Sequence, residues 1–182
     1  MTAATTSAAK NDRLKKRFEK WDVNHNGRIE KSDYEAEARR IINAFGEDSA
    51  SPQARALIDA FTSMFEYLAT KAGVGPNGAM SEGQFIEVAE AQIFQDGDSG
   101  FNRVVRPTIA AIVGMCDTDG DGEVSPAEFG KWLKAVGVES SAADEAFRKI
   151  DANGNGKLTV DELVLAVRDY HMGRLDVPLL GK

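Results

Sequence analysis

The sequence predicts an all-α protein in which four helix–loop–helix units form two pairs within one compact body. Acidic, glycine-containing loops recur along the chain and begin at Asp22, Asp117 and Asp151, which indicates an internal repeat. Apolar residues recur at helical spacing on both sides of these loops. The chain has 182 residues, of which 42% are hydrophobic and 28% charged, so it is long and apolar enough to bury a core.

Stripes of apolar residues predict about eight helices, each with one buried face. The first two stripes flank the loop at Asp22, and the others precede, separate or follow the later loops. Core packing explains every stripe more simply than a binding groove does. In chain order the stripes are Leu14, Phe18 and Trp21; Tyr34, Ala38, Ile41, Ile42 and Phe45; Leu57, Ile58, Phe61, Phe65 and Leu68; Ile109, Ile112 and Val113; Phe129, Trp132, Leu133 and Val136; and Leu163, Val167 and Tyr170.

The loop at residues 117–128 matches the twelve-residue calcium-binding pattern at every specified position. Calcium is a hard cation that takes six to eight oxygen ligands, so the pattern places oxygen-bearing side chains at alternate positions and a glycine at the sharp turn. Position 7 offers its backbone carbonyl, and the glutamate at position 12 reaches back from the outgoing helix. The serine at position 9 also forms a capping box with that glutamate. The predicted ligands are Asp117, Asp119, Asp121, Glu123, Ser125 and Glu128.

The loop at residues 151–162 repeats the complete pattern, with fewer carboxylates. Asparagines replace aspartates at positions 3 and 5, and a threonine and a glutamate form the capping box. Two such matches at this spacing between helices predict two calcium sites. The predicted ligands of the second are Asp151, Asn153, Asn155, Lys157 through its carbonyl, Thr159 and Glu162.

The loop at residues 22–33 fits the pattern except at position 12, where Asp33 replaces glutamate. The side chain is one methylene shorter, so it more readily supplies one oxygen than two, which favours the six-coordinate shell of magnesium. We therefore expect a weaker preference for calcium over magnesium here than in the other two loops. The predicted ligands are Asp22, Asn24, Asn26, Arg28 through its carbonyl, Glu30 and Asp33.

A fourth loop, at residues 73–84, is needed if the loops pair through short antiparallel contacts at position 8, where Ile29, Val124 and Leu158 stand. Aligning Met80 with that position leaves no carboxylate at positions 1, 3, 5 or 12. We interpret this loop as a structural partner of the first loop without bound metal. It also spells G-V-G-P-N-G, but a helical segment precedes it instead of a strand, which argues against dinucleotide binding.

These loops divide the chain into five regions. We expect a flexible tail at 1–9, a first loop pair at 10–94, a linker at 95–102, a second loop pair at 103–170 and an apolar tail at 171–182. The last region carries Leu175, Val177, Leu179 and Leu180. We expect it to dock against the protein's own apolar surface; a frayed tail and a partner-binding peptide are the alternatives.

Composition excludes several classes of partner. The formal charge of −7 and the pI near 4.9 argue against nucleic acid or an anionic membrane surface and favour cations. The longest apolar run, residues 109–116, is far too short to span a bilayer. Cys116 is the only cysteine, so an intrachain disulfide is excluded. We expect a cytoplasmic monomer.

An enzymatic function finds no support among the residues. His25 stands at a non-ligand position of the first loop, and neither His171 nor Cys116 has a partner recognisable from the sequence. The helix–loop–helix units leave no residues for a catalytic domain. We therefore predict no catalytic residues and no organic cofactor.

Several segments resemble the sarcoplasmic calcium-binding protein group of EF-hand proteins: RLKKRFEKWD, FEYLATKAGVG, FNRVV, IVGMCD and GRLDV. The resemblance covers nearly the whole chain. It implies two EF-hand pairs, with metal at the first, third and fourth loops and none at the second. It also implies calcium buffering or transport. The alternative is a calcium sensor, in which metal binding exposes an apolar groove to an unidentified protein partner.

Overall fold

A computed structural model of the chain describes residues 3–177 and confirms the all-α prediction. Residues 1–2 and 178–182 lie outside the described part. The first half consists of α1 (Ala3–Trp21), β1 (Arg28–Ile29), α2 (Lys31–Ala44), α3 (Pro52–Lys71), β2 (Met80–Ser81), α4 (Glu82–Ala89) and a short π-helix η1 (Glu90–Phe94). The second half consists of α5 (Asp98–Val104), α6 (Arg106–Cys116), α7 (Pro126–Ala135), α8 (Ser140–Ile150) and α9 (Val160–His171).

Helix starts follow local capping signals. Ser81, Ser125 and Thr159 each accept a hydrogen bond from the backbone N–H three residues on, and the side chain at that third residue returns a bond to the cap. These capping boxes begin α4, α7 and α9 and satisfy N–H groups that the helix leaves free. Each helix that leaves a loop is therefore fixed by residues of the loop itself.

The prediction of a flexible tail at 1–9 is wrong for residues 3–9, which form the first turns of α1. Alanine dominates this segment, and it contains neither glycine nor proline. Alanine has the highest helix propensity, so the helix that contains Leu14 and Phe18 continues backwards through these residues. The low hydropathy of the segment concealed this continuation.

The expected linker at 95–102 is also partly helical, because α5 begins at Asp98. Only residues 95–97 form a turn, which Gly97 makes possible with a positive φ of 57°. Phe101 is buried and packs edge-on against Phe94, with ring centroids 5.2 Å apart. The short segment therefore contributes to the core as well as joining the halves.

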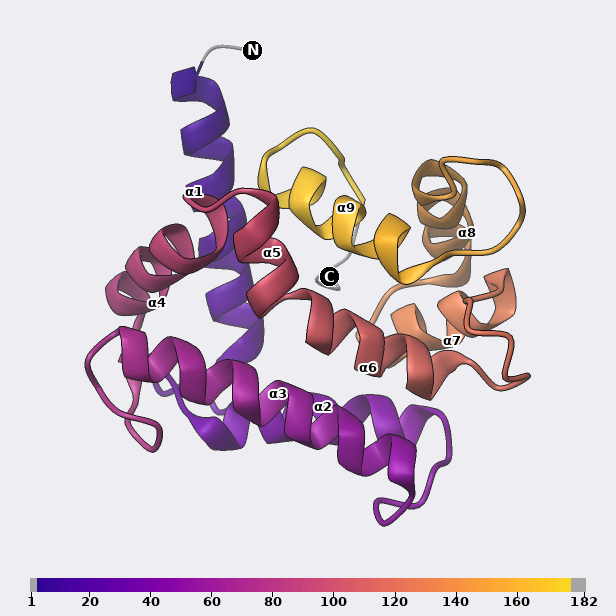
Figure 1. Ribbon diagram of the computed structural model, residues 1–182, viewed down its shortest axis with the longest axis horizontal. Coiled ribbons are helices and arrows are strands. Elements are labelled where there is room, and N and C mark those ends of the chain that lie inside the picture. The colour runs from indigo at the N-terminus through magenta and orange to yellow at the C-terminus, as the bar shows by residue number, and fades with distance from the viewer. Residues whose placement is uncertain (1–2, 178–182) are drawn as a thin grey trace.

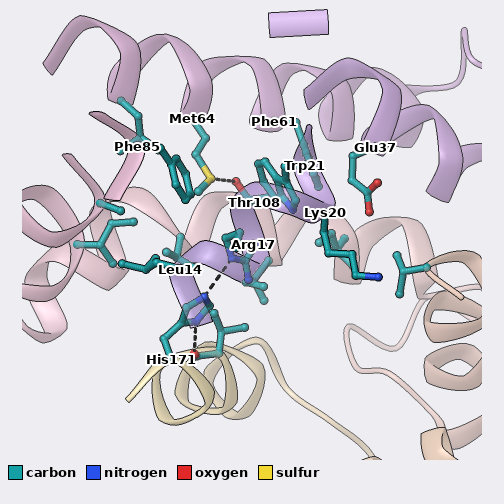
Figure 2. Close-up of a pocket in the computed structure, with 18 of the residues that line it drawn as sticks. Leu14, Arg17, Lys20, Trp21, Glu37, Phe61, Met64, Phe85, Thr108 and His171 are labelled. Atoms are coloured by element: carbon teal, nitrogen blue, oxygen red, sulfur yellow. Dashed lines mark hydrogen bonds between the residues drawn. The ribbon is translucent and has the colours of Figure 1, made fainter. Parts of the chain in front are cut away.

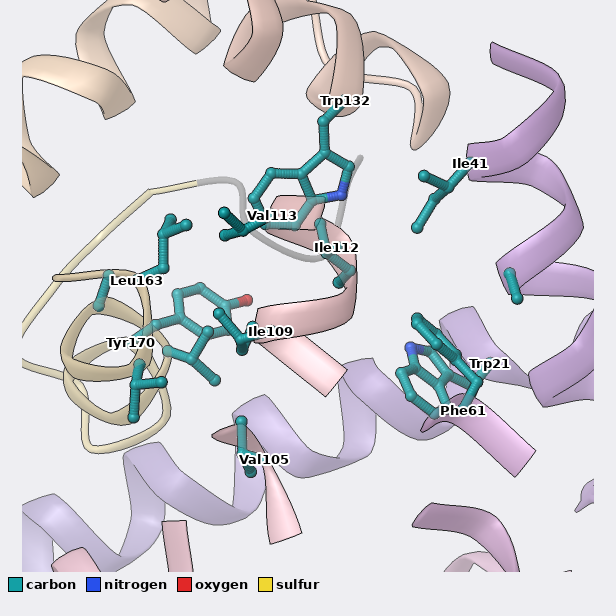
Figure 3. Close-up of a cluster of buried hydrophobic side chains, with 14 of the residues drawn as sticks. Trp21, Ile41, Phe61, Val105, Ile109, Ile112, Val113, Trp132, Leu163 and Tyr170 are labelled. Atoms are coloured by element: carbon teal, nitrogen blue, oxygen red, sulfur yellow. The ribbon is translucent and has the colours of Figure 1, made fainter. Parts of the chain in front are cut away.

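The hydrophobic core is continuous between the two halves. In Figure 1, α6 crosses the centre of the molecule between α3 and α9, and it contacts both. Figure 3 shows Ile109 and Ile112 of α6 between Tyr170 of α9 and the stacked rings of Trp21 and Phe61. The loop pairs thus share one core.

The segment after α9 also reaches this core. Val177 is 4% exposed, and Leu175 is half-buried against the same cluster. The remainder of the expected apolar tail, 178–182, lies outside the described residues. Within the described part, no helix combines the length and the apolar character needed to cross a membrane.

Candidate metal centre

The loops meet in pairs through short antiparallel contacts, as the sequence predicts. Ile29 pairs with Met80 and Arg28 pairs with Ser81. Ile29 and Met80 are fully buried. In the second half, Val124 and Leu158 exchange two backbone hydrogen bonds of 2.8 Å. Met80 therefore occupies the position that the alignment of the fourth loop assigned to it, and the two loops of each pair are held side by side.

The loop at 117–128 gathers its acidic side chains around one point. Carboxylate oxygens of Asp117, Asp119 and Glu128 lie within 4.8 Å of one another. Asp117 accepts backbone hydrogen bonds from Gly120 and Gly122, both at 2.8 Å, and Asp121 accepts one from the amide of Glu123 at 2.9 Å. The backbone thus holds the carboxylates in place although they repel one another.

Glu128 closes this loop from the first turn of α7. Its Oε1 accepts from the amide and hydroxyl of Thr118, at 3.0 and 2.8 Å, and its Oε2 accepts from the amide of Ser125 at 2.9 Å. Burial acts to raise the pKa of Glu128, but these hydrogen bonds together lower it below its usual value. The side chain is therefore held as an anion that bridges positions 2 and 9 of the loop.

The electrostatics of the same loop favour a cation. Contact between the carboxyl groups of Asp117 and Asp119 raises the pKa of Asp119, with burial as the next cause. Like charges this close disfavour ionisation, and a divalent cation relieves that repulsion. The oxygen donors, without histidine or cysteine among them, are the ligand type of calcium and magnesium.

The loop at 151–162 has the same backbone arrangement. Asp151 accepts from the amides of Asn155 and Gly156 at 3.2 and 2.9 Å, and Asn153 accepts from Asn155 at 2.9 Å. Glu162 accepts from the amide of Thr159 at 3.0 Å. The side-chain oxygens predicted from the sequence are therefore positioned as in the preceding loop, with two carboxylates in place of four among them.

The loop at 22–33 repeats these hydrogen bonds with a shorter closing side chain, but among the described residues its acids Asp22, Glu30 and Asp33 do not converge as those of 117–128 do. Asp33 is 2% exposed; its Oδ1 accepts from the amide of Val23 at 3.2 Å and its Oδ2 from the amide of Glu30 at 2.8 Å. These are positions 2 and 9, the pair that Glu128 bridges. Burial raises the pKa of Asp33, and the two amide hydrogen bonds oppose that shift. Asp22 accepts from Asn26 and Gly27 at 3.0 and 2.8 Å.

The loop at 73–84 keeps the closing hydrogen bond of the metal-type loops but lacks their carboxylates at positions 1, 3, 5 and 12. Gln84 Oε1 accepts from the amide of Ser81 at 2.9 Å, as the position-12 carboxylates do in the other loops. Gly78 has no positive φ, unlike Gly27, Gly122 and Gly156 at the equivalent position. It is required for a different reason, because a Cβ at Gly78 would lie 2.1 Å from the carbonyl oxygen of Val74.

Two features of the loops escaped the sequence argument. The ammonium group of Lys157, predicted to matter only through its carbonyl, donates to Asp121 Oδ2 and lies 3.8 Å from Asp119 Oδ2. His25 adopts a left-handed φ of 56°, where the other two metal-type loops have Gly120 and Gly154. The contact of Lys157 depends on the pairing of two loops in space, so the sequence does not reveal it. The left-handed backbone of His25 could have been found by comparing position 4 across the three loops.

Paired helix–loop–helix units with oxygen-lined twelve-residue loops define the EF-hand class of calcium-binding proteins. Residues 109–168 match the EF-hand domain pair. The chain is 49% identical to calerythrin of Saccharopolyspora erythraea over 176 residues, which cover 97% of this chain and 99% of that protein. The chain therefore belongs to the EF-hand family, as a calerythrin-like member, and its calcium-binding character is established by this kinship.

Solved structures agree with this assignment. A Streptomyces coelicolor calcium-binding protein that takes part in prokaryotic calcium-mediated regulation is 29% identical, with a TM-score of 0.76, and the match covers 90% of this chain and 98% of that one. Magnesium-loaded apo-berovin, a ctenophore photoprotein whose three calcium-binding loops all bind magnesium, is 25% identical with a TM-score of 0.70 over 88% of this chain and 87% of that one.

Proposed function

We propose that the protein is an intracellular calcium buffer with three metal sites, at residues 22–33, 117–128 and 151–162, for which magnesium competes. The observation that carries the proposal is the convergence of Asp117, Asp119 and Glu128 within 4.8 Å in a loop of calcium-binding pattern. In all three loops the position-1 carboxylate accepts a hydrogen bond from the backbone amide of the position-6 glycine. The site residues are those named for each loop in the sequence analysis.

Magnesium competition is proposed to be strongest at 22–33. Asp33 bridges the same two amides as Glu128 with a side chain one methylene shorter. A shorter reach favours one oxygen over two and thus the smaller, octahedral ion. That all three calcium-binding loops of berovin bind magnesium supports competition by magnesium in general, without distinguishing the first loop.

A buffer is favoured over a sensor by the surface of the described residues. Sensors of this family type open to expose a methionine-rich groove. Here Met80 and Met115 are buried, and Val23 and Leu165 are the only large hydrophobic residues exposed in residues 3–177. Met64 and Met172 are half-buried, and these four methionines lie in separate segments, in α3, β2, α6 and after α9. Relationship to the Streptomyces protein of calcium-mediated regulation is the observation that favours the sensor alternative.

We further infer a cytoplasmic monomer without a catalytic role. Cys116 is free and buried, and burial raises the pKa of its thiol, so it is not a reactive nucleophile. Size-exclusion chromatography with light scattering, with calcium and with chelator, tests the monomeric state; a dimer in either condition contradicts it.

Calorimetric calcium titration of metal-stripped protein, with and without millimolar magnesium, tests the function. A buffer gives three sites of submicromolar affinity that magnesium weakens. Two micromolar sites indifferent to magnesium would remove the first loop and favour the sensor.

A further inference from the structure

A cavity of about 300 Å³ lies in the shared core beneath the first metal-type loop. Its walls come from α1, α2, α3, α4, η1, α5, α6, α7 and α9, and Figure 2 shows Trp21, Phe61, Phe85 and Met64 around it. Protein interiors are close-packed and rarely contain voids larger than a water molecule. A cavity of this volume, lined mainly by apolar and aromatic side chains, has the size of a small-molecule site.

The cavity contains an arginine that is not paired with an acid. Arg17 donates from Nε to His171 Nε2 at 3.1 Å, as the dashed line in Figure 2 shows, and its guanidinium carbon lies 5.3 Å from the centre of the Trp21 ring. In residues 3–177 no carboxylate lies within ion-pairing distance of Arg17. A cation enclosed by protein without a counter-charge is costly, and an anion beside it removes that cost.

His171 fixes the orientation of this arginine. Its Nδ1 lies 2.8 Å from the carbonyl oxygen of Val167, which assigns the proton to Nδ1 and leaves Nε2 to accept from Arg17. Burial, with the charge of Arg17, lowers the pKa of His171 to about 3, so the ring is neutral. Arg17 is therefore held from its Nε side, and no described residue accepts a hydrogen bond from its two terminal nitrogens.

The buried acid that lines the cavity, Glu37, already has a partner. Glu37 is 8% exposed, and its Oε2 lies 3.3 Å from Nη1 of Arg40. That oxygen makes no hydrogen bond to a described residue. Arg40 and Lys20 are exposed at the same end of the cavity. With Arg17 included, three cationic side chains line the cavity against two acids, Glu37 and the exposed Glu19.

We propose that this cavity binds one apolar organic anion with a flat aromatic body, its acidic group against the terminal nitrogens of Arg17 and its rings among Trp21, Phe61 and Phe85. The aromatic walls favour a flat ring system through stacking and edge contacts, and Arg17 supplies geometry suited to an oxyanion. The π-helix η1 turns Ile93 and Phe94 into the same space. The cavity borders the first metal-type loop through Val23 and His25. None of the residues proposed to hold the anion is a predicted metal ligand, so the proposal does not depend on how many loops bind calcium.

Two probes that differ by one sulfonate group test the proposal on the calcium-saturated full chain. The anionic probe is 8-anilinonaphthalene-1-sulfonate, and N-phenyl-1-naphthylamine is its uncharged counterpart. Calorimetry and fluorescence measure stoichiometry and affinity. We expect one molecule of either probe per chain, with the sulfonate bound more tightly.

Two variants assign the binding to this cavity. Arg17→Met should weaken the sulfonate by about 10- to 100-fold and change the affinity for the neutral probe less than threefold. Ala89→Leu places extra carbons in the cavity from its buried wall position and should weaken both probes. Arg39→Met, on the exposed face of α2 and away from the cavity, is the matched control and should change neither.

Three results would overturn the proposal. The first is sulfonate binding that Arg17→Met and Arg39→Met leave equally unchanged. The second is that Ala89→Leu binds both probes as tightly as the parent does. This variant still tests the proposal if Arg17→Met does not fold. The third is saturable binding that appears only in a chain ending at Val177, because the protein's own residues 178–182 would then be the occupant.

Discussion

The ammonium group of Lys157 donates a hydrogen bond to Asp121 Oδ2, so a residue of one loop contacts a predicted ligand of its paired loop. Both side chains are partly exposed. A calcium ion coordinated by Asp121 lies close to this positive charge and is repelled by it. The contact therefore offsets part of the negative charge of the loop without metal and opposes binding of the ion.

Replacing Lys157 with methionine is expected to raise the calcium affinity of the 117–128 loop. The expected gain is about two- to fivefold at low ionic strength, the magnitude of an exposed charge pair, and it should shrink as salt screens the charge. Loop-resolved calcium titration measures it. Lys149→Met, which removes a lysine of α8 paired with Glu145, is the control. A decrease in affinity would show that Lys157 supports the site.

Lengthening the side chain at position 12 of the first loop should increase its selectivity for calcium. Asp33→Glu restores the second oxygen, and we expect the ratio of calcium to magnesium affinity to rise by on the order of tenfold, equivalent to about 1.4 kcal/mol. Competition titrations measure the ratio. The mirror change Glu128→Asp should lower the same ratio at its own loop. Equal ratios in Asp33→Glu and the parent would contradict the proposed role of Asp33.

Relieving the backbone strain at His25, a non-glycine residue with a left-handed φ, should stabilise the protein. His25→Gly places glycine at a φ of 56°, where Gly120 and Gly154 stand in the other loops, and the free energy of unfolding should rise by about 0.5–1 kcal/mol. Urea unfolding of the metal-free protein measures it. His25→Ala keeps the backbone strain without the imidazole and should give no gain; equal stabilisation by both variants would show that the ring is the destabilising element.

Acidification should destabilise the fold through His171. Its pKa is about 3 in the folded state against an ordinary value near 6.5, so below pH 6.5 the unfolded chain takes up a proton that the folded chain does not. Stability from this group is complete above pH 6.5 and is lost as pH falls towards 3, by roughly 1.4 kcal/mol per pH unit.

The pKa values of Asp33 and Glu37 are raised in the folded protein, so these groups stabilise the fold on acidification and oppose the effect of His171. Because both acids are present in His171→Gln and in the parent, comparing the two proteins isolates the contribution of His171. The difference in unfolding free energy should narrow by roughly 2 kcal/mol between pH 6.5 and 5. Parallel curves for His171→Gln and the parent would show that His171 is not a buried neutral base.

The loop architecture was predictable because the calcium-binding pattern is local. Residues within twelve positions carry the turn, the oxygen donors and the helix cap, and placing Met80 at position 8 of the fourth loop was enough to predict its pairing with Ile29. The extension of α1 through residues 3–9 was missed because its residues are polar or small, although alanine favours helix strongly.

Other features were not predictable, because they join residues distant in sequence. Arg17 and His171 are 154 positions apart, and the contact of Lys157 with Asp121 requires two loops to pair first. A stripe containing Trp21 and Phe61 predicts burial but not the cavity that these side chains surround. Sequence periodicity identifies which faces are apolar; the fit between them is set by the tertiary structure.

Glycine amide resonances test the central claim, that three particular loops bind calcium, most directly. Gly27, Gly122 and Gly156 each donate to the position-1 carboxylate of their loop at 2.8, 2.8 and 2.9 Å, so a cation on that carboxylate polarises the N–H group. Gly78 donates instead to the carbonyl of Gly75 at 3.1 Å and serves as the internal control. In a ¹⁵N-resolved calcium titration, we predict large downfield shifts of the first three resonances and none of Gly78. An unshifted Gly27 at saturating calcium would contradict the three-site account, and a shifted Gly78 would contradict the assignment of the fourth loop.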